Sequence, residues 1–127
     1  MITGIGVDTT LVSRIEESLD RFGDRLVARV LHESERTEFE SCRQPAQFLA
    51  KRFAIKEAAA KALGTGIREG VSLHDFVTEH DKLGKPLLSV GGVAAEMCAA
   101  QGINHFHVSL TDEADNVTAF AVFERID

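Results

Sequence analysis

The sequence predicts an α+β fold in which helices pack on a small antiparallel sheet. Segments 105–112 and 117–126 have strand patterns and are separated only by a short polar loop. Segments 74–81 and 85–90 form a second such pair. Consecutive strands with short connections pair in the antiparallel direction. The alanine-rich segment 46–63 predicts one long helix, because alanine, leucine, lysine and glutamate favour helices.

The N-terminal half should begin with a strand and continue with short helices. Residues 2–8 have a strand pattern that contains Gly4 and Gly6, and glycine in a strand lets another backbone or a ligand approach closely. Ser13 and Glu16 have the spacing of a capping box, which predicts the start of a helix. Three short helices are therefore expected, at residues 13–22, 24–31 and 34–42.

The long helix and the C-terminal half carry clear boundary signals. Pro45 suits the first turn of the long helix, and Gly64 should end that helix. The strands at 74–81 and 85–90 are joined around Leu83-Gly84-Lys85, and a helix at 93–101 should end at Gly102.

Composition restricts the kinds of protein this chain can be. The 127 residues fit one domain, 1–127, and 44% hydrophobic with 27% charged residues is ordinary for a soluble globular protein. A net charge of −6 argues against nucleic-acid binding, and no apolar run is long enough to cross a membrane. The first ten residues do not resemble a signal peptide, so we expect a cytoplasmic protein. Cys42 and Cys98 are expected to be two reduced thiols.

Two charged residues stand on the apolar stripe of the long helix. At 100° per residue, Glu57 and Lys61 fall near the middle of that stripe, whereas Arg52 and Lys56 fall on another side. Glu57 and Lys61 are four residues apart and can form an ordinary surface ion pair. The functional alternative is a site for a hard cation and a phosphate. Mg²⁺ is usually held by one or two carboxylates together with substrate phosphates and water.

Asp8 and His107 are the other candidate site residues. Asp8 closes the first strand, where its alternative role is that of a turn-forming residue. His107 projects from the face of segment 105–112 that is opposite Phe106 and Val108, where it can also be an ordinary half-exposed histidine. Together with Glu57 they would supply two acids and a histidine from segments that can converge.

The motifs around these residues resemble the bacterial holo-acyl-carrier-protein synthases, the short 4′-phosphopantetheinyl transferases. The resembling stretches are GIGVD, RFAIKEAAAKALG and HVSLTD, in this order, and the likeness covers essentially the whole chain. The resemblance implies the phosphopantetheinyl transferase-like fold and transfer of 4′-phosphopantetheine from coenzyme A to a serine of apo-acyl carrier protein. It further implies release of 3′,5′-ADP, dependence on Mg²⁺, a role in fatty acid biosynthesis, and a homotrimer with active sites at the subunit interfaces.

The resemblance also implies roles for individual residues. Asp8 and Glu57 match the metal ligands, Lys61 matches the lysine near the pyrophosphate, and His107 matches an active-site histidine. Further positions match segments that line the coenzyme site: Arg52, Gly64 and the turn Gly84-Lys85-Pro86. The base that takes the proton of the attacking serine can be Glu57, a metal-bound water or His107, and we favour Glu57 because it lies beside the metal.

A basic strip predicts where the carrier protein docks. Arg14, Arg21 and Arg25 are spaced seven and four residues apart and share one face if the helix is continuous, although Gly23 can interrupt it. Acyl carrier proteins are acidic, so such a strip on an otherwise acidic enzyme can steer and hold them. The alternative is a solvated helix face.

Two other functions stay open at the level of sequence. The chain can be a module that binds coenzyme A or a nucleotide with Mg²⁺ but performs no catalysis. It can also be a structural or interaction domain in which Glu57 and Lys61 form only an ion pair, but that alternative leaves the glycines before Asp8 without a purpose.

Overall fold

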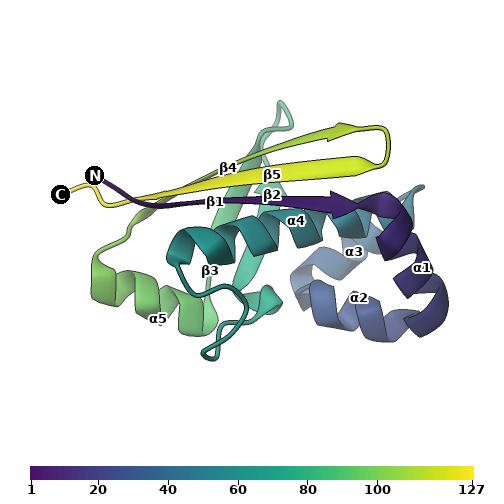
Figure 1. Cartoon of the computed structure of the whole chain (residues 1–127), viewed down its shortest axis with the longest axis horizontal. Coiled ribbons are helices and arrows are strands. Elements are labelled where there is room, and N and C mark those ends of the chain that lie inside the picture. Colours follow the sequence, from purple (N-terminus) through teal and green to yellow (C-terminus); the bar gives the residue numbers. More distant parts are fainter.

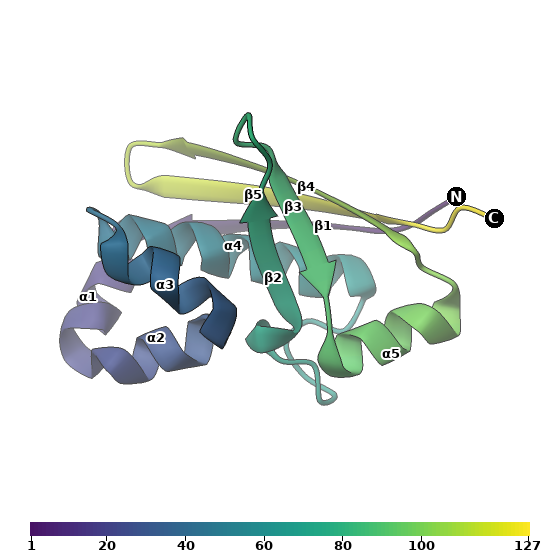
Figure 2. The same ribbon diagram turned by 180° about the vertical axis from the view of Figure 1, so that it is seen from behind.

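A computed structural model describes residues 1–127 and shows one long helix, α4, surrounded by all other elements (Figure 1). A three-stranded sheet, in the order β1-β5-β4, covers one side of α4, and a two-stranded hairpin, β2-β3, crosses its other side (Figure 2). The elements in chain order are β1 (Ile2–Leu11), α1 (Val12–Phe22), α2 (Asp24–Val30), α3 (Glu33–Ser41), α4 (Pro45–Leu63), the 3₁₀ helix η1 (Leu73–Asp75), β2 (Phe76–His80), β3 (Pro86–Val90), α5 (Gly92–Gln101), β4 (His105–Glu113) and β5 (Asn116–Glu124).

The α+β class predicted from the sequence is confirmed, with one difference in the sheet. All strand pairs are antiparallel, but they belong to two separate sheets on opposite sides of α4. Pro45 occupies the first turn of α4, and Gly64 ends that helix in the left-handed conformation with φ 99°, both as expected. None of the helices has the length and apolar character of a membrane-spanning segment.

Strand β1 lies directly on the backbone of α4, and two glycines make this contact possible. A Cβ atom added to Gly4 would overlap the carbonyl oxygen of Ala62. A Cβ atom added to Gly6 would overlap the carbonyl oxygen of Ala58 and lie 2.7 Å from the amide nitrogen of Ala62. The close approach expected for glycines in this strand is therefore made to the central helix.

Helix α4 is buried on nearly all sides, so its surroundings differ from those of a helix with a single apolar stripe. Its fully buried residues are mostly alanines, whose small side chains let the sheet and the β2-β3 hairpin come close to the helix. Arg52 and Lys56 face the hairpin side, and they are 4% and 0% exposed. A long helix in the centre of a small fold thus buries charges as well as alanines.

The start of α1 differs from the capping box predicted at Ser13. The helix begins at Val12, directly after β1, and its N-cap residue Leu11 makes no side-chain cap hydrogen bond. Ser13 instead donates from its backbone N–H (2.9 Å) and its Oγ (2.5 Å) to the carboxylate of Asp115, in the turn between β4 and β5. A tertiary contact has replaced the local cap that the spacing of Ser13 and Glu16 suggested.

Two further boundaries differ from the sequence prediction. Strand β1 continues to Leu11 instead of ending at Asp8, so Asp8 lies inside the strand and pairs with Ala119 of β5. The first residues of the predicted strand 74–81 belong to η1, which is held by a capping box between Ser72 and Asp75.

We predict that replacing Gly6 with alanine destabilises the fold by about 3 kcal/mol, because the added methyl group meets helix backbone that no side-chain movement can clear. Gly91→Ala is the matched control, since a Cβ atom there would lie 4.0 Å from the nearest atom, the carbonyl oxygen of Asp75. Urea unfolding of both variants measures the difference. Equal losses in the two variants would contradict the close contact between β1 and α4.

Candidate active site

Asp8 faces α4 because it follows the two glycines at alternate positions of β1. It lies opposite Ala119 in the β1-β5 ladder, and Ala119 is 1% exposed. The Oγ1 of Thr10 donates a hydrogen bond of 2.8 Å to Asp8 Oδ2. The Asp8 side chain is therefore held at the boundary between strand and helix, where it is only 16% exposed.

Lys61 reaches from α4 to this strand. Its ammonium donates to the carbonyl oxygen of Val7 (3.0 Å) and to Asp8 Oδ1 (3.3 Å). The ion pair of Lys61 is therefore with Asp8 and not with Glu57, its neighbour four residues earlier. The surface ion pair that the spacing of Glu57 and Lys61 allowed is not formed.

Glu57 lies close enough to Asp8 for the two carboxylates to repel each other. Burial raises the pKa of Glu57, and the negative charge of Asp8 raises it further. The positive charges of Lys61 and Arg29 act in the opposite direction. Asp8 and Glu57, which we call the acid pair, thus share one electrostatic environment, although they come from β1 and α4.

The acid pair fits a divalent cation of the Mg²⁺ type. Its donors are carboxylate oxygens, which hard cations prefer, and the repulsion that raises the pKa of Glu57 is the kind that a cation relieves. No group of three or more His, Cys, Asp or Glu side chains is placed to hold a metal by itself. Water and phosphate oxygens would have to complete the coordination, as is usual for Mg²⁺.

His107 does not join the acid pair within one chain, so the possible convergence of their segments is not made inside a single subunit. It lies on β4 opposite Val122, with its side chain on the face of the sheet that points away from α4, whereas Asp8 points toward α4. Its Nε2 pairs with Glu124 Oε1 at 3.0 Å. The hydrogen bond from His107 lowers the pKa of Glu124.

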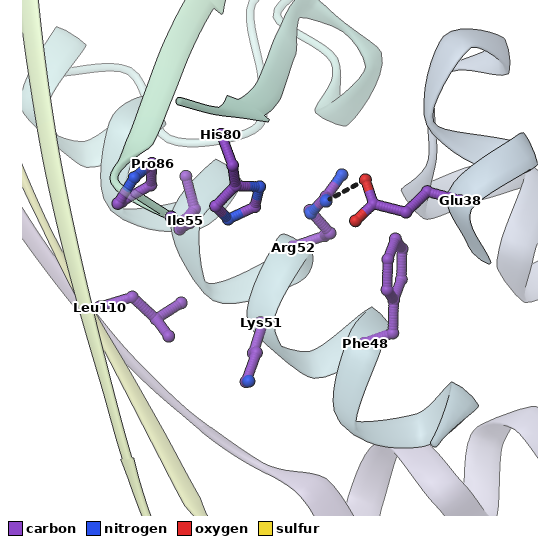
Figure 3. A pocket seen from close by; sticks show the side chains of 9 residues that line it. Glu38, Phe48, Lys51, Arg52, Ile55, His80, Pro86 and Leu110 are labelled. Carbon is purple, nitrogen blue, oxygen red and sulfur yellow. Dashed lines mark hydrogen bonds and ion pairs between the residues drawn. The ribbon is translucent and has the colours of Figure 1, made fainter. Parts of the chain in front are cut away.

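A groove of about 450 Å³ opens beside the β2-β3 hairpin (Figure 3). Three residues predicted for the coenzyme site, Arg52, Gly84 and Pro86, line it. Lys85 lies between the lining residues Gly84 and Pro86. Its turn is ordered by Asp81, whose Oδ1 accepts the N–H of Lys85 at 2.9 Å. The lining residues of this β2-β3 groove are Glu38, Phe48, Lys51, Arg52, Ile55, His80, Gly84, Pro86 and Leu110.

Gly64, the remaining residue predicted for the coenzyme site, lies elsewhere. It follows the last turn of α4, three residues after Lys61, and is not among the residues that line the β2-β3 groove. A Cβ atom on Gly64 would meet nothing within 4 Å, so the backbone at this end of the helix is open. Gly64 therefore belongs to the end of α4 that carries Lys61, and not to the β2-β3 groove.

A buried charge network on the hairpin side of α4 has no counterpart in the sequence interpretation. Lys56 Nζ donates to Glu35 Oε1 (2.7 Å) and to the carbonyl oxygens of Leu73 (3.1 Å) and Phe76 (2.5 Å). Arg52 Nη1 donates to Glu35 Oε2 at 3.2 Å. Burial lowers the pKa of Lys56, while the charge of Glu35 acts against this shift. The spacing of Arg52 and Lys56, four residues apart in an alanine-rich helix, is the sequence signal that could have revealed this network.

Arg52 connects this network to the β2-β3 groove. Its Nη2 donates to Glu38 Oε1 at 3.1 Å, and its guanidinium carbon lies 4.5 Å from the centre of the Phe48 ring (Figure 3). The Arg52 side chain is 5% exposed, so most of its hydrogen-bonding capacity is already used by the protein. Lys51 and His80 are the other basic side chains that line this groove.

The predicted strip of arginines is bent, and two of its three members share a contact. Gly23 (φ 55°) separates α1 from α2, so Arg14, Arg21 and Arg25 do not lie on one continuous helix. Arg21 and Arg25 nevertheless lie over the same ring, that of Phe22, at 5.3 and 5.9 Å. The Phe22 side chain is 45% exposed, so an apolar group stands among the positive charges.

Arg29 extends this surface toward the acid pair. It lines a small hollow of about 170 Å³ together with Phe22, Arg25 and Leu26, and its charge lowers the pKa of Glu57. Arg29 was not predicted from the sequence as a docking residue, although it lies one helical turn after Arg25. We refer to Arg14, Arg21, Phe22, Arg25 and Arg29 as the basic surface.

Comparisons with known proteins agree on one family. A model described as the 4′-phosphopantetheinyl transferase superfamily matches residues 4–121. A holo-[acyl-carrier-protein] synthase from Vibrio cholerae is 48% identical over 125 residues, which are 98% of this chain and 99% of the relative. The crystal structure of a holo-[acyl-carrier-protein] synthase from Neisseria meningitidis is 43% identical, with a TM-score of 0.92 over 98% of this chain and 100% of that one.

A further solved structure contains a ligand. It is a holo-(acyl-carrier-protein) synthase from Bacillus anthracis in complex with CoA (3′,5′-ADP), and it is 34% identical to this chain with a TM-score of 0.83. The match covers 99% of each chain. The likeness therefore extends over the whole fold described above, including both elements that carry the acid pair.

We predict that Asp8→Asn lowers the pKa of Glu57 in metal-free buffer, because it removes the neighbouring negative charge. In the wild type, the raised pKa contributes stability that is present below the ordinary value of 4.5 and lost as pH rises through the folded-state pKa. The free energy of unfolding should therefore fall less with rising pH in Asp8→Asn. Carboxyl NMR titration of Glu57 measures the shift, with exposed Glu96→Gln as control, and an unchanged pKa would refute the coupling.

Proposed function

The chain belongs to the 4′-phosphopantetheinyl transferase superfamily, and we propose that it transfers 4′-phosphopantetheine from coenzyme A to a serine of apo-acyl carrier protein, releasing 3′,5′-ADP. The observation that carries this function is the meeting of Asp8 and Lys61 beside Glu57 in a fold that matches holo-[acyl-carrier-protein] synthases along its full length. The proposal includes fatty acid biosynthesis in the cytoplasm as its setting.

In this proposal Asp8 and Glu57 hold Mg²⁺. When bound, the cation would supply positive charge beside the diphosphate of coenzyme A and make the reacting phosphorus more electrophilic. The support for this assignment is the chemistry of the donors: two carboxylates that repel each other, with no third protein ligand. Thr10 would keep its hydrogen bond to Asp8 Oδ2 and thereby fix the orientation of that carboxylate.

Lys61 supplies a second positive charge for the diphosphate. Its side chain is 50% exposed, so the ammonium can exchange its contact with Asp8 for a phosphate oxygen. Charge builds up on the leaving and non-bridging oxygens during phosphoryl transfer, and fixed positive groups stabilise it. The carbonyl oxygen of Val7 would still orient the ammonium during this exchange.

We assign the proton of the attacking serine to Glu57, directly or through one water molecule. The carboxylate lies beside the cation and therefore beside the reacting phosphate. A carboxylate oxygen can accept this proton within hydrogen-bond reach of the hydroxyl or through one water molecule. His107 is the alternative acceptor, but it faces away from α4 and would have to act in the site of a neighbouring subunit.

The β2-β3 groove is proposed to take part of the coenzyme. Lys51 and His80 offer positive or hydrogen-bonding groups, while Pro86 and Leu110 offer apolar contacts (Figure 3). Arg52 would act mainly by shaping this groove, because Glu35, Glu38 and the carbonyl oxygen of Thr78 already accept its hydrogen bonds. Lys85 on the hairpin turn and Gly64 at the open end of α4 complete the proposed contacts.

The basic surface is proposed to dock the carrier protein. Acyl carrier proteins are acidic, and positive charge on an enzyme with a net charge of −6 would steer them. Phe22 adds an exposed ring between Arg21 and Arg25, which suits an apolar anchor surrounded by charge. Arg29 extends this surface toward Glu57, where the serine must arrive.

We further propose a homotrimer with the active sites between subunits. The face of the β1-β5-β4 sheet that points away from α4 exposes Ile5 (61%), Val7 (53%) and Phe120 (43%). Exposed apolar side chains grouped on one sheet face are typical of an interface. His107 lies on the same face, so assembly would bring it to the site of another copy.

We predict that Asp8→Ala and Glu57→Ala each lower transfer at least about 10²-fold while the fold is retained, because each removes a proposed metal ligand. The assay incubates the protein with coenzyme A, Mg²⁺ and an apo carrier, and measures the mass of the carrier. Chelation of Mg²⁺ should stop the wild-type reaction.

The exposed residue Glu96 on α5 provides the matched control, since Glu96→Ala removes the same charge outside the proposed site. Circular dichroism tests whether each variant is folded. Wild-type activity in either acid-pair variant would overturn the metal assignment. Binding of coenzyme A without transfer by the wild type would support a non-catalytic binding module, and neither binding nor transfer would support a structural domain.

We predict that the wild type sediments as a trimer and that Val7→Glu sediments as a monomer with little transfer activity. The new charge would be buried without a partner in an apolar interface, which is strongly unfavourable. Ala100→Glu, which adds the same charge to the exposed surface of α5, should stay trimeric. A wild type that sediments as a monomer and still transfers phosphopantetheine would refute interface active sites.

A further inference from the structure

Helix α1 begins without a cap from its own segment. The first N–H groups of a helix need acceptors, and the side chain of Leu11 offers none. Asp115 supplies two of these acceptors. Its carbonyl oxygen accepts the N–H of Val12 at 2.9 Å, and its Oδ1 accepts the N–H of Ser13 at 2.9 Å. Its Oδ2 also accepts the hydroxyl of Ser13 at 2.5 Å.

Asp115 is itself fixed by the sheet. It belongs to the turn between β4 and β5, where Glu113 pairs with Asn116 and Ala114 adopts a positive φ of 54°. Asn116 also pairs with Leu11, the last residue of β1, so the turn lies beside the point where α1 starts (Figure 1). The sheet thereby holds the carboxylate at the N-terminal end of α1, where the helix dipole also favours a negative charge.

The direction of α1 is set by its packed face and by this end together. Ile15 is the only buried residue of the helix, and Val12 and Leu19 pack partly buried against the core, so these side chains fix which face of α1 meets the core. At the other end the chain turns at Gly23 with φ 55° and leaves α1. Arg14 directly follows Ser13, and Arg21 lies two turns further along the same face.

We propose that Asp115 is a positioning residue for carrier docking. By holding the first turn of α1 against the sheet, it fixes the direction in which Arg14 and Arg21 face an acidic carrier. Its hydrogen bonds all go to Val12 and Ser13, and it lines neither described groove. This inference rests on the proposed function, because it concerns the carrier substrate of that reaction.

Steady-state kinetics of Asp115→Ala tests the proposal. The KM for the carrier should rise about fivefold, the factor that corresponds to the loss of one helix cap. The kcat and the KM for coenzyme A should change by less than about twofold, since the acid pair and the β2-β3 groove are not touched. A purely structural role would instead lower kcat and affect both substrates.

Three companion variants sharpen the result. Glu113→Ala removes the same charge from the same hairpin. The Glu113 side chain is exposed and forms no hydrogen bond or ion pair, so this variant should leave both KM values unchanged. Asp115→Asn keeps an oxygen that can accept the N–H of Ser13 and should restore most of the carrier KM. Arg14→Glu changes the basic surface itself and should raise the carrier KM more than Asp115→Ala.

The outcomes separate this inference from the proposed function. If the wild type modifies no carrier, the proposed function fails and this inference fails with it. If the wild type is active but the carrier KM is unchanged in Asp115→Ala or in Arg14→Glu, only the positioning role is overturned. If Asp115→Ala does not fold, Ser13→Ala decides, because it removes only the hydroxyl bond and should raise the carrier KM about twofold. An unchanged value overturns the proposal.

Discussion

The contact between the backbones of β1 and α4 is the constraint on which the site depends. Because Gly4 and Gly6 have no side chains, the strand lies directly on the helix, and the next residue on that face, Asp8, comes beside Glu57 and Lys61. Charged groups that are about fifty residues apart in the chain are thus brought together by a strand and a helix, and no loop has to position them. Rigid elements hold such groups more precisely than loops do, which suits a reaction that depends on positioning.

The opposite side of α4 is fixed by buried charges. Lys56 has three acceptors for its three N–H bonds, and the Glu35 carboxylate accepts from both Lys56 and Arg52. A buried ion pair is weak evidence for stability, but buried charges that hydrogen-bond to defined partners favour one arrangement of the elements that they join. We therefore interpret this network as the device that sets the rotation of α4, and with it the direction of Glu57.

Local patterns in the sequence predicted the α+β class, nearly every element and the limits of α4, because proline, glycine and alternation act over a few residues. The motif resemblance selected Asp8, Glu57 and Lys61, which the fold brings together. The replacement of the cap at Ser13 by Asp115 could not be foreseen, since it depends on a contact across the fold. Burial of Lys56 depends in the same way on elements far along the chain. The face of the sheet that carries His107 followed from alternation, but its position relative to Asp8 required the strand order.

The glycine contact also limits how this protein can change over evolution. At Gly6 the obstacle to any larger residue is the main chain of Ala58 and Ala62. A compensatory substitution on the helix cannot create room, because every amino acid has the same main chain. Only a shift of the whole helix would help, and that shift would carry Glu57 away from Asp8. Positions 4 and 6 are thus closed to neutral drift for as long as selection maintains the pair of acids.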